Sequence, residues 1–220
     1  MLKTKTIADT IYEELKRSIL DMDFMPGSKL SEAQTAKKFQ VSRAPVRDAI
    51  QRLQQENLVL VRPQVGTIVS PIASYEKAME ICEVRLLLEP YIARKAACNF
   101  SGEEKEVLSR LFEKLQAALP GTPEHDALLF ETDLMLHSAL WEKAGNSEME
   151  TILTGYKREI KRIQFTNMKL TKRSSESANE MRVIFDAILE NNPSKCEEAM
   201  RRHVTNLAKA LQEALGNSEV

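Results

Sequence analysis

The chain has 220 residues, of which 43% are hydrophobic and 29% charged, and its formal net charge at pH 7 is −1. This length suits two modest domains, and a charge this close to zero does not by itself indicate a nucleic-acid partner. No apolar run approaches the roughly 20 residues needed to cross a bilayer and no signal peptide opens the sequence, so we expect a cytoplasmic protein without membrane contact. Three widely spaced cysteines, Cys82, Cys98 and Cys196, fit neither a disulfide framework nor a zinc spacing, and free thiols are expected.

The first forty residues predict a long helix followed by a short one. Apolar side chains recur at helical spacing over residues 4–21, which predicts the first helix. Pro26-Gly27-Ser28 then breaks the chain, and a second helix is predicted from Ser31 to Lys38. A tight turn over residues 39–41 leads into a third helix, so the order is that of a helix-turn-helix.

The third predicted helix begins after Ser42, a residue type that accepts a backbone N–H of the first helical turn. Pro45 falls in that first turn, where its missing N–H does no harm. One face of the helix is apolar and is expected to be buried: Val46, Ala49, Ile50 and Leu53.

The other face of this helix carries Arg43 and Arg47, one turn apart, beside the small residue Ala44. Such an end suits the major groove of DNA, because Arg pairs bidentately with guanine and holds phosphates. Taken alone, the helix is equally compatible with solvated arginines on an ordinary surface. The residues that follow favour DNA binding, since two β-branched runs, 58–62 and 67–70, flank a turn at Pro63–Gly66 and predict a hairpin, or wing.

Charge is divided unequally along the chain. The first 72 residues hold 11 Lys and Arg against 8 Asp and Glu, a net +3, whereas the remainder holds 20 against 24, a net −4. A basic head on an acidic body is typical of a DNA-binding domain joined to a domain that does not bind DNA. We therefore place a domain boundary at residue 72, with domains at 1–72 and 73–220.

The second part of the chain is predicted to be entirely helical. Helical spacing of apolar residues continues almost to the C-terminus, interrupted by turn residues such as Ser101-Gly102 and Pro120-Gly121. About six helices are expected, over residues 74–98, 102–119, 123–144, 147–168, 175–191 and 194–215.

Several polar residues fall on the apolar stripes of these helices. Asp133 and His137 share an inward face one turn apart, and His203 lies on the apolar stripe of the last helix. Asp-x-x-x-His can bind one metal ion together with a third ligand. From the residues alone, the favoured interpretation is a buried histidine that forms a hydrogen bond with the aspartate. Two roles are equally compatible with Arg85. It could form an ion pair with Glu89 or Glu83, or it could bind the carboxylate of an effector. His125, just after Pro123, is expected to be a surface residue at a helix start.

Residues 7–72 resemble the winged helix-turn-helix of the GntR family of bacterial transcription regulators, through PGSKLSE (26–32), the run Val41–Ala49 and Gly66. The rest resembles the all-helical effector (FCD) domain of that family's FadR-like branch, through Glu83, Arg85, Leu88-Glu89, Asp133, His137, Gly145-Asn146 and His203. Two departures occur in the first part. Ala33 stands where many relatives have Arg, and Gln40 stands where the turn usually has Gly.

The resemblance implies a double-stranded DNA operator as partner. The residues expected to contact it are Ser42, Arg43, Ala44, Pro45, Arg47, Gly66 and Thr67. It also implies that an effector binds in the helical domain, at Arg85, Asp133, His137, Asn146, Met181 and His203.

A divalent metal ion (Zn, Ni or Mn) is a further implication of the resemblance, with Asp133, His137 and His203 as its ligands. Many relatives carry a third histidine at this centre, and Met181 stands at the matching position here. A thioether is a poor ligand for these ions, so the site is expected to be weaker than in those relatives.

The sequence therefore indicates a mainly α protein, with a winged helix-turn-helix followed by a helical bundle. Its expected function is that of a nucleoid-associated transcriptional regulator, a homodimer on a palindromic operator, whose DNA affinity changes when a small carboxylate metabolite binds. Two alternatives remain, a metal-dependent enzyme using Asp133, His137 and His203, and a helical protein-interaction module. No general acid or base stands beside those three residues, and the placement of Arg43 and Arg47 disfavours the interaction module.

Overall fold

The computed structural model describes residues 6–70 and 75–215, which form two compact units. One unit takes in the chain up to Ala78 together with Arg158–Thr166, and the other takes in Met79–Lys157 and the chain from Asn167 onward. The described residues contain no helix long and apolar enough to cross a membrane. The mainly α fold predicted from the sequence is confirmed.

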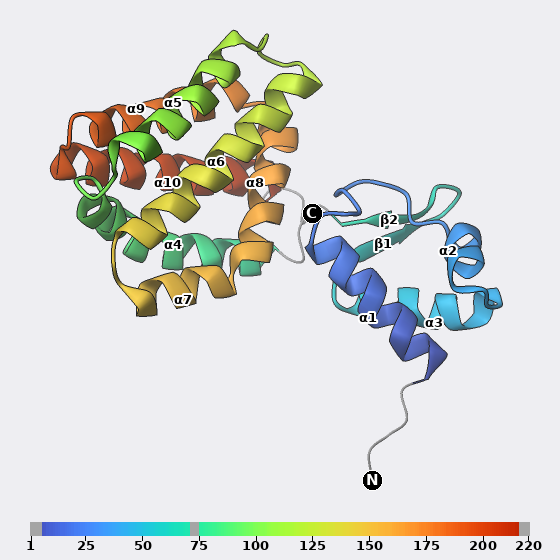
Figure 1. The fold of residues 1–220 in the computed structure, drawn as a ribbon. Helices are drawn as coiled ribbons and strands as arrows, with labels where there is room; N and C mark the ends of the chain where they lie inside the picture. Colours follow the sequence, from blue (N-terminus) through green and yellow to red (C-terminus); the bar gives the residue numbers. More distant parts are fainter. Residues whose placement is uncertain (1–5, 71–74, 216–220) are drawn as a thin grey trace. The chain divides into compact units, whose positions relative to one another are not determined.

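The first unit has the element order of a winged helix-turn-helix (Figure 1). Its helices are α1 (Ile7–Leu20), α2 (Glu32–Phe39) and α3 (Arg43–Gln55), followed by β1 (Val59–Arg62) and β2 (Gly66–Val69). Thr6 caps α1 in a reciprocal capping box with Asp9, and the Ser31 hydroxyl accepts a hydrogen bond from the Gln34 N–H at the start of α2. Local capping thus sets the starts of α1 and α2, and α1 begins three residues later than the expected range of 4–21.

The turn between α2 and α3 depends on Gln40. This residue ends α2 in the left-handed region, at φ 55° and ψ 44°. Glycine adopts this conformation without strain, whereas a side chain with a Cβ makes it less favourable. The backbone at Gln40 is therefore mildly strained, and α2 packs against α3 on either side of the turn.

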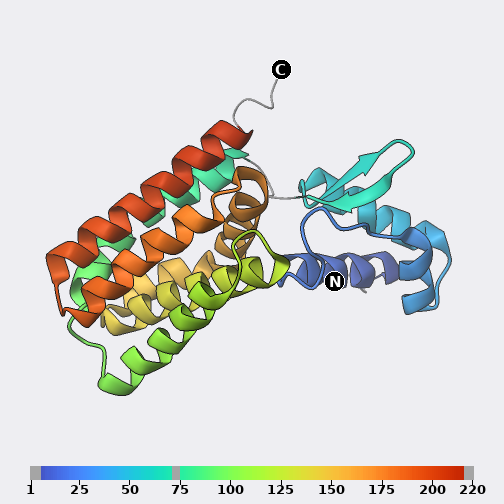
Figure 2. The same ribbon diagram turned by 90° about the horizontal axis from the view of Figure 1, so that it is seen from above.

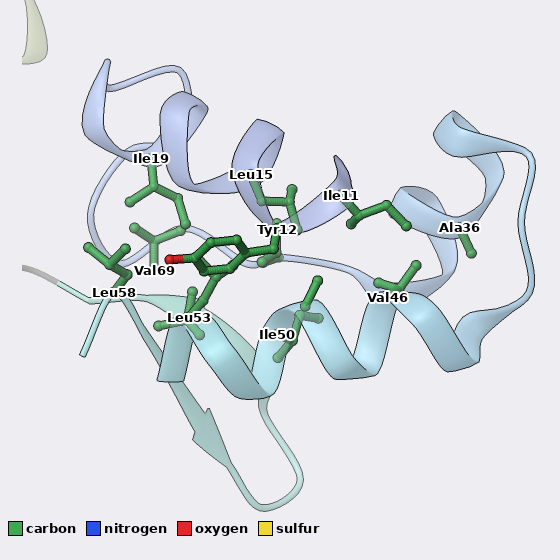
Figure 3. Close-up of a cluster of buried hydrophobic side chains, with 13 residues drawn as sticks. Ile11, Tyr12, Leu15, Ile19, Ala36, Val46, Ile50, Leu53, Leu58 and Val69 are labelled. Atoms are coloured by element: carbon green, nitrogen blue, oxygen red, sulfur yellow. The ribbon is translucent and has the colours of Figure 1, made fainter. Parts of the chain in front are cut away.

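Apolar side chains from all three helices and the wing meet in one core (Figure 3). α1 and α3 supply most of it, because each places its apolar residues on one face at helical spacing. The labelled members of this core are Ile11, Tyr12, Leu15, Ile19, Ala36, Val46, Ile50, Leu53, Leu58 and Val69. Burying the apolar face of α3 leaves its polar face turned outward.

The wing is a two-stranded antiparallel hairpin in which Val59 pairs with Val69 and Arg62 with Gly66. Gly66 has φ +95°, a value that side chains with a Cβ rarely adopt, so glycine allows the chain to turn back here. Lys29 bridges to Ile68 of β2, which ties the segment before α2 to the wing.

Seven helices make up the remainder of the described chain. They are α4 (Tyr75–Ala96), α5 (Gly102–Ala117), α6 (Pro123–Lys143), α7 (Ser147–Gly155), α8 (Lys157–Thr171), α9 (Ser174–Leu189) and α10 (Pro193–Leu215). The single helix expected over 147–168 is wrong, because the chain breaks at Tyr156 between α7 and α8. Gly155, a weak helix former, precedes the break, and Tyr156 leaves the helical region with ψ 7°.

Four of these helices pack against one another in the second unit. α5, α6 and α9 contact one another and α10 packs along α9, and both views show the four helices running roughly along a common direction (Figures 1 and 2). The rings of Phe112 in α5 and Phe185 in α9 stack with their centroids 4.7 Å apart. This arrangement brings the polar residues on the inward faces of α6 and α10 into the interior.

Candidate functional site

The N-terminal half of α3 presents a polar surface to solvent. Ser42, Arg43, Ala44 and Arg47 are exposed and Pro45 is half-buried, whereas the apolar face predicted from the sequence is buried. Ser42 occupies the N-cap position, but its hydroxyl makes no capping hydrogen bond, contrary to the expectation. That hydroxyl therefore does not satisfy a helix N–H.

Arg47 is not a lone solvated arginine. Its Nε donates a hydrogen bond to Glu32 Oε2 of α2 over 2.9 Å, and the two side chains are 64% and 32% exposed. The guanidinium has five N–H donors and this contact uses one, so most of its hydrogen-bonding capacity is left for another acceptor. Glu32 was not among the residues that the sequence singled out at this surface.

The two wing residues expected to contact DNA differ in their exposure. Gly66 is exposed at the tip of the hairpin. Thr67 is only 8% exposed, because it points into the unit, and its carbonyl oxygen accepts a hydrogen bond from the Leu30 N–H over 2.9 Å. The geometry thus argues against a DNA contact from the Thr67 side chain, since alternation along a strand turns every second residue inward.

A buried cluster of ionisable side chains lies inside the second unit. Asp133 and His137 come from α6 and His203 from α10, and one potential ligand atom from each lies within 4.8 Å of the others. His137 Nε2 lies 3.6 Å and His203 Nε2 lies 3.3 Å from the same oxygen, Oδ1 of Asp133. These three side chains face one another, as the inward stripes of their helices would require.

Two further carboxylates contact the Nδ1 atoms of the two imidazole rings. Glu89 Oε2 lies 3.1 Å from His137 Nδ1, and Glu180 Oε2 lies 3.0 Å from His203 Nδ1. A carboxylate at one ring nitrogen fixes the orientation of the ring and makes the other nitrogen a better ligand. Both rings therefore turn Nε2 toward Asp133.

The charges in this cluster shift one another's protonation. Burial alone would lower the pKa of His137, but the nearby carboxylates of Glu89 and Asp133 raise it to about 9. The pKa of His203 is likewise raised, because its hydrogen bonds to Asp133 and Glu180 outweigh burial. The two histidines in turn hold the pKa of Asp133 below its usual range despite burial. The neighbouring carboxylates thus favour the protonated form of both imidazoles.

Arg85 is fully buried and forms the ion pair that was one of its two expected readings. Its Nε and Nη2 donate to the two oxygens of Glu89 over 3.0 and 3.2 Å, while Glu83, the other candidate partner, is exposed. Nη1 of Arg85 is buried and has no hydrogen-bond partner among the described residues. One edge of the guanidinium thus keeps a donor that the ion pair does not use. The ion pair with Glu89 is therefore compatible with a second role for Arg85, the binding of an effector carboxylate.

The remaining residues singled out from the sequence differ in their burial and in their hydrogen bonds. Asn146 is the N-cap of α7, and its Oδ1 accepts a hydrogen bond from the Met149 N–H, so its carbonyl is already engaged. Met181 is completely buried on α9, next in sequence to Glu180. His125 is 3% exposed, so the expectation of a surface residue is wrong, because the first turn of α6 packs into the unit.

Glu180 is the main residue of the cluster that the sequence did not reveal. It is held by Arg173, whose Nη2 lies 2.6 Å from Glu180 Oε1, and by the side-chain amide of Asn206 at 2.7 Å. The only available signal was a charged residue beside the apolar stripe of α9, which is common on any amphipathic helix. Its role became visible only when α9 and α10 were placed side by side.

An exposed helix end that carries two arginines, set in a winged helix-turn-helix, is typical of the DNA-binding domain of a regulator. The joined helical unit, with a buried polar cluster, is the second part of such a regulator. The model of bacterial regulatory proteins of the gntR family matches residues 7–69, and the FCD domain model matches residues 80–206. The chain therefore belongs to the GntR family of transcriptional regulators, in the branch that carries an FCD domain.

Relatives with this architecture match along nearly the whole chain. The chain is 25% identical over 210 residues to the HTH-type transcriptional repressor RspR of Escherichia coli K12, covering 96% of this chain and 91% of that protein. It is 26% identical over 235 residues to the HTH-type transcriptional repressor NanR of Salmonella newport, covering 98% and 88%. Because the chain belongs to this family of regulators, the alternative hypothesis of a metal-dependent enzyme is rejected. The protein is a transcriptional regulator and not an enzyme.

Solved structures share the fold at lower identity. McbR/YncC of E. coli superposes with a TM-score of 0.58 at 18% identity, covering 96% of this chain and 99% of the other. A GntR regulator from Rhodococcus sp. RHA1 gives a TM-score of 0.59 at 18% identity, with 94% and 98% coverage. At this identity the similarity concerns the fold alone.

Proposed function

We propose that this regulator binds a two-fold symmetric operator as a homodimer and changes its DNA affinity when a small carboxylate metabolite binds in the FCD domain. The observation that carries the DNA part is the exposed end of α3, with Arg43 and Arg47 on a helix whose opposite face is buried. One winged head contacts only a few base pairs, so useful specificity requires two heads on a palindromic site.

The DNA part is tested with the Arg43→Ala and Arg47→Ala variants. If the side chains bind base edges, each variant loses about 1–3 kcal/mol of affinity for the operator and little for unrelated duplexes. If they bind phosphates only, both duplexes lose affinity alike and the salt dependence becomes shallower. Operator binding that equals wild type in both variants contradicts the assignment of α3 as the recognition helix.

Assembly is tested by sedimentation. The chain has a mass of 24.9 kDa, so a dimer sediments at about 50 kDa. We place the contacts of the dimer in the domain from residue 73 onward, because the winged head is needed for DNA. A species of 24.9 kDa at micromolar concentration that still binds operator tightly contradicts the proposed dimer.

The effector site is assigned to the cluster of Asp133, His137 and His203. Around an ion with bonds of 2.0–2.2 Å, neighbouring ligand atoms lie roughly 3.0–3.5 Å apart, and the two Nε2 atoms lie 3.6 and 3.3 Å from Asp133 Oδ1. The donor set therefore fits one divalent cation with further coordination positions for ligand oxygens. A bound cation would supply positive charge to attract a carboxylate.

Arg85 supports the proposal that the effector is an anion. Its unpartnered Nη1 adds a buried donor on α4, and burial without a partner is costly for such a group. A carboxylate that accepts this hydrogen bond would remove the cost. Where no ion is held, the imidazoles of His137 and His203 would serve as further positively charged donors.

The effector site is tested by metal analysis and by thermal shift. The metal content of gently purified protein is compared with that of the His137→Ala variant, in which one ligand is lost. Thermal shift with divalent ions, small carboxylates and both together then separates the two ligands, since any ligand specific to the folded state raises the unfolding temperature. A wild-type protein that responds to none of them contradicts the proposed effector site.

A further inference from the structure

One side of α4, the helix labelled in Figure 1, carries a stripe of residues that are exposed in the FCD domain. Leu87 is 77% exposed and Tyr91 is 47% exposed, which is unusual for large apolar side chains. Glu80, Leu87 and Arg94 follow one another at intervals of seven residues, so they lie along a single line on the helix. The half-buried Val84 and Leu88 lie beside this line.

The positions of the stripe are spaced symmetrically about Leu87, and the charges at its two ends are opposite. Counting outward from Leu87, Glu83 and Tyr91 are each four residues away, and Glu80 and Arg94 are each seven residues away. The N-terminal half of the stripe is thus acidic and the C-terminal half ends in a cation. Arg94 pairs with Glu197 of its own chain over 3.1 Å, and its side chain is still 54% exposed with further N–H donors on the guanidinium. An antiparallel copy of the same helix would place this guanidinium opposite Glu80 and the Tyr91 hydroxyl opposite Glu83.

We propose that α4 packs against α4 of a second copy of this chain, antiparallel, with the two-fold axis passing through Leu87. The proposal rests on the dimer of the proposed function and names the surface that forms it. A two-fold interface uses the same patch on both copies and must be complementary to itself, and the stripe meets this condition in both its apolar centre and its charged ends. A partner of one charge would not match both ends.

The distribution of charge along α4 would also stabilise the helix in a single copy of the chain. Acidic residues near the N-terminus of a helix and basic residues near its C-terminus also interact favourably with its dipole. The dipole does not account for an apolar centre at Leu87 and Tyr91. A stable dimer buries roughly 1,200–2,000 Å² in total, so the interface would extend from the stripe to the flanking Val84 and Leu88.

Cysteine cross-linking tests the axis directly. Cys98 is an exposed thiol two residues after the end of α4, so the background is Cys98→Ser. In an antiparallel pair with its axis at Leu87, two copies of residue 87 face each other, whereas two copies of residue 83 are separated by about 12 Å along the helix. Disulfides require Cα atoms within about 7 Å. Mild oxidation should therefore join Leu87→Cys into a covalent dimer, leave Glu83→Cys unlinked, and join the double variant Glu83→Cys/Tyr91→Cys.

A charge substitution at the same position gives an independent measurement. Leu87→Glu places two carboxylates against each other on the axis, and we expect dimer dissociation to increase at least tenfold in sedimentation at dilute concentrations. Leu119→Glu is the matched control, because Leu119 is 72% exposed and lies between α5 and α6, away from the stripe. Both substitutions are at exposed positions and should leave the helical content unchanged.

The outcomes separate this inference from the proposed function. If wild type is a dimer but Leu87→Cys does not cross-link and Leu87→Glu dissociates no more than Leu119→Glu, the α4 interface is refuted and the dimer stands. If wild type is a monomer, the dimer itself is refuted. Cross-linking of Glu83→Cys as readily as Leu87→Cys contradicts the position of the axis.

Discussion

Glu32 is expected to restrain DNA binding, because its carboxylate holds the arginine that the proposal places in the major groove. Arg47 Nε donates to Glu32 Oε2 over 2.9 Å in an exposed ion pair. Binding of Arg47 to a guanine or a phosphate must weaken this contact or bring the Glu32 carboxylate close to the DNA. We therefore predict that Glu32→Gln raises operator affinity, because Gln keeps the shape of the side chain and removes its charge.

The magnitude follows from the exposure of the pair. Exposed ion pairs contribute about 0.2–1 kcal/mol, which corresponds to an affinity gain of roughly 1.4-fold to fivefold when the competing pair is removed. The gain is smaller than the loss of about 1–3 kcal/mol expected for Arg47→Ala. Glu32 also lies in the first turn of α2, where its charge favours the helix, so the variant should unfold slightly more easily.

Glu14→Gln is the matched control for this measurement. Glu14 is also 32% exposed and pairs with an arginine, Arg17 of α1, so the variant makes the same change in net charge within the same unit. Affinity is measured by fluorescence anisotropy on an operator selected from random sequences and on a scrambled duplex, between 50 and 200 mM salt.

Two results would refute the reasoning. The first is an equal gain for Glu32→Gln and Glu14→Gln, which would make the effect one of net charge only. The second is a gain that persists in full when Arg47 is already alanine, since the double variant isolates the coupling between the two residues.

Three further predictions concern the buried cluster. Met181→His should raise the affinity for Ni²⁺ or Zn²⁺ tenfold or more in calorimetric titration, because an imidazole replaces a thioether, and an unchanged affinity would place residue 181 away from the ion. Cation binding to wild type should strengthen as the pH rises from 6 to 9, because His137, whose pKa is raised to about 9, and His203 must both lose protons to bind an ion. Titrations in buffers of different ionisation enthalpy would reveal the released protons, and binding without proton release would contradict the assignment. Arg85→Met should destabilise the protein by about 3–5 kcal/mol in urea unfolding, because it removes the guanidinium that pairs with both oxygens of the buried Glu89. Arg85→Met/Glu89→Met should be more stable than the single variant.

The sequence determined the elements whose formation depends on near neighbours. The start of α2 at Ser31, the left-handed turn at Gln40 and the buried face of α3 each depend on residues within one or two helical turns. Capping and helical periodicity are local properties, so the order of helices and strands in the winged head could be predicted before the structure was known. The same locality allowed Asp133 and His137 to be placed on one face of a helix.

The tertiary structure decided every contact that joins residues far apart in the chain. Glu180 reaches His203 only because α9 and α10 pack together, and Glu32 meets Arg47 only across the turn between α2 and α3. His125, expected at the surface, is buried, because exposure depends on what packs over a residue and not on its position in a helix. Whether Arg85 pairs with Glu83 or Glu89 was also undetermined, since both lie on its own helix and only burial of one face selects Glu89.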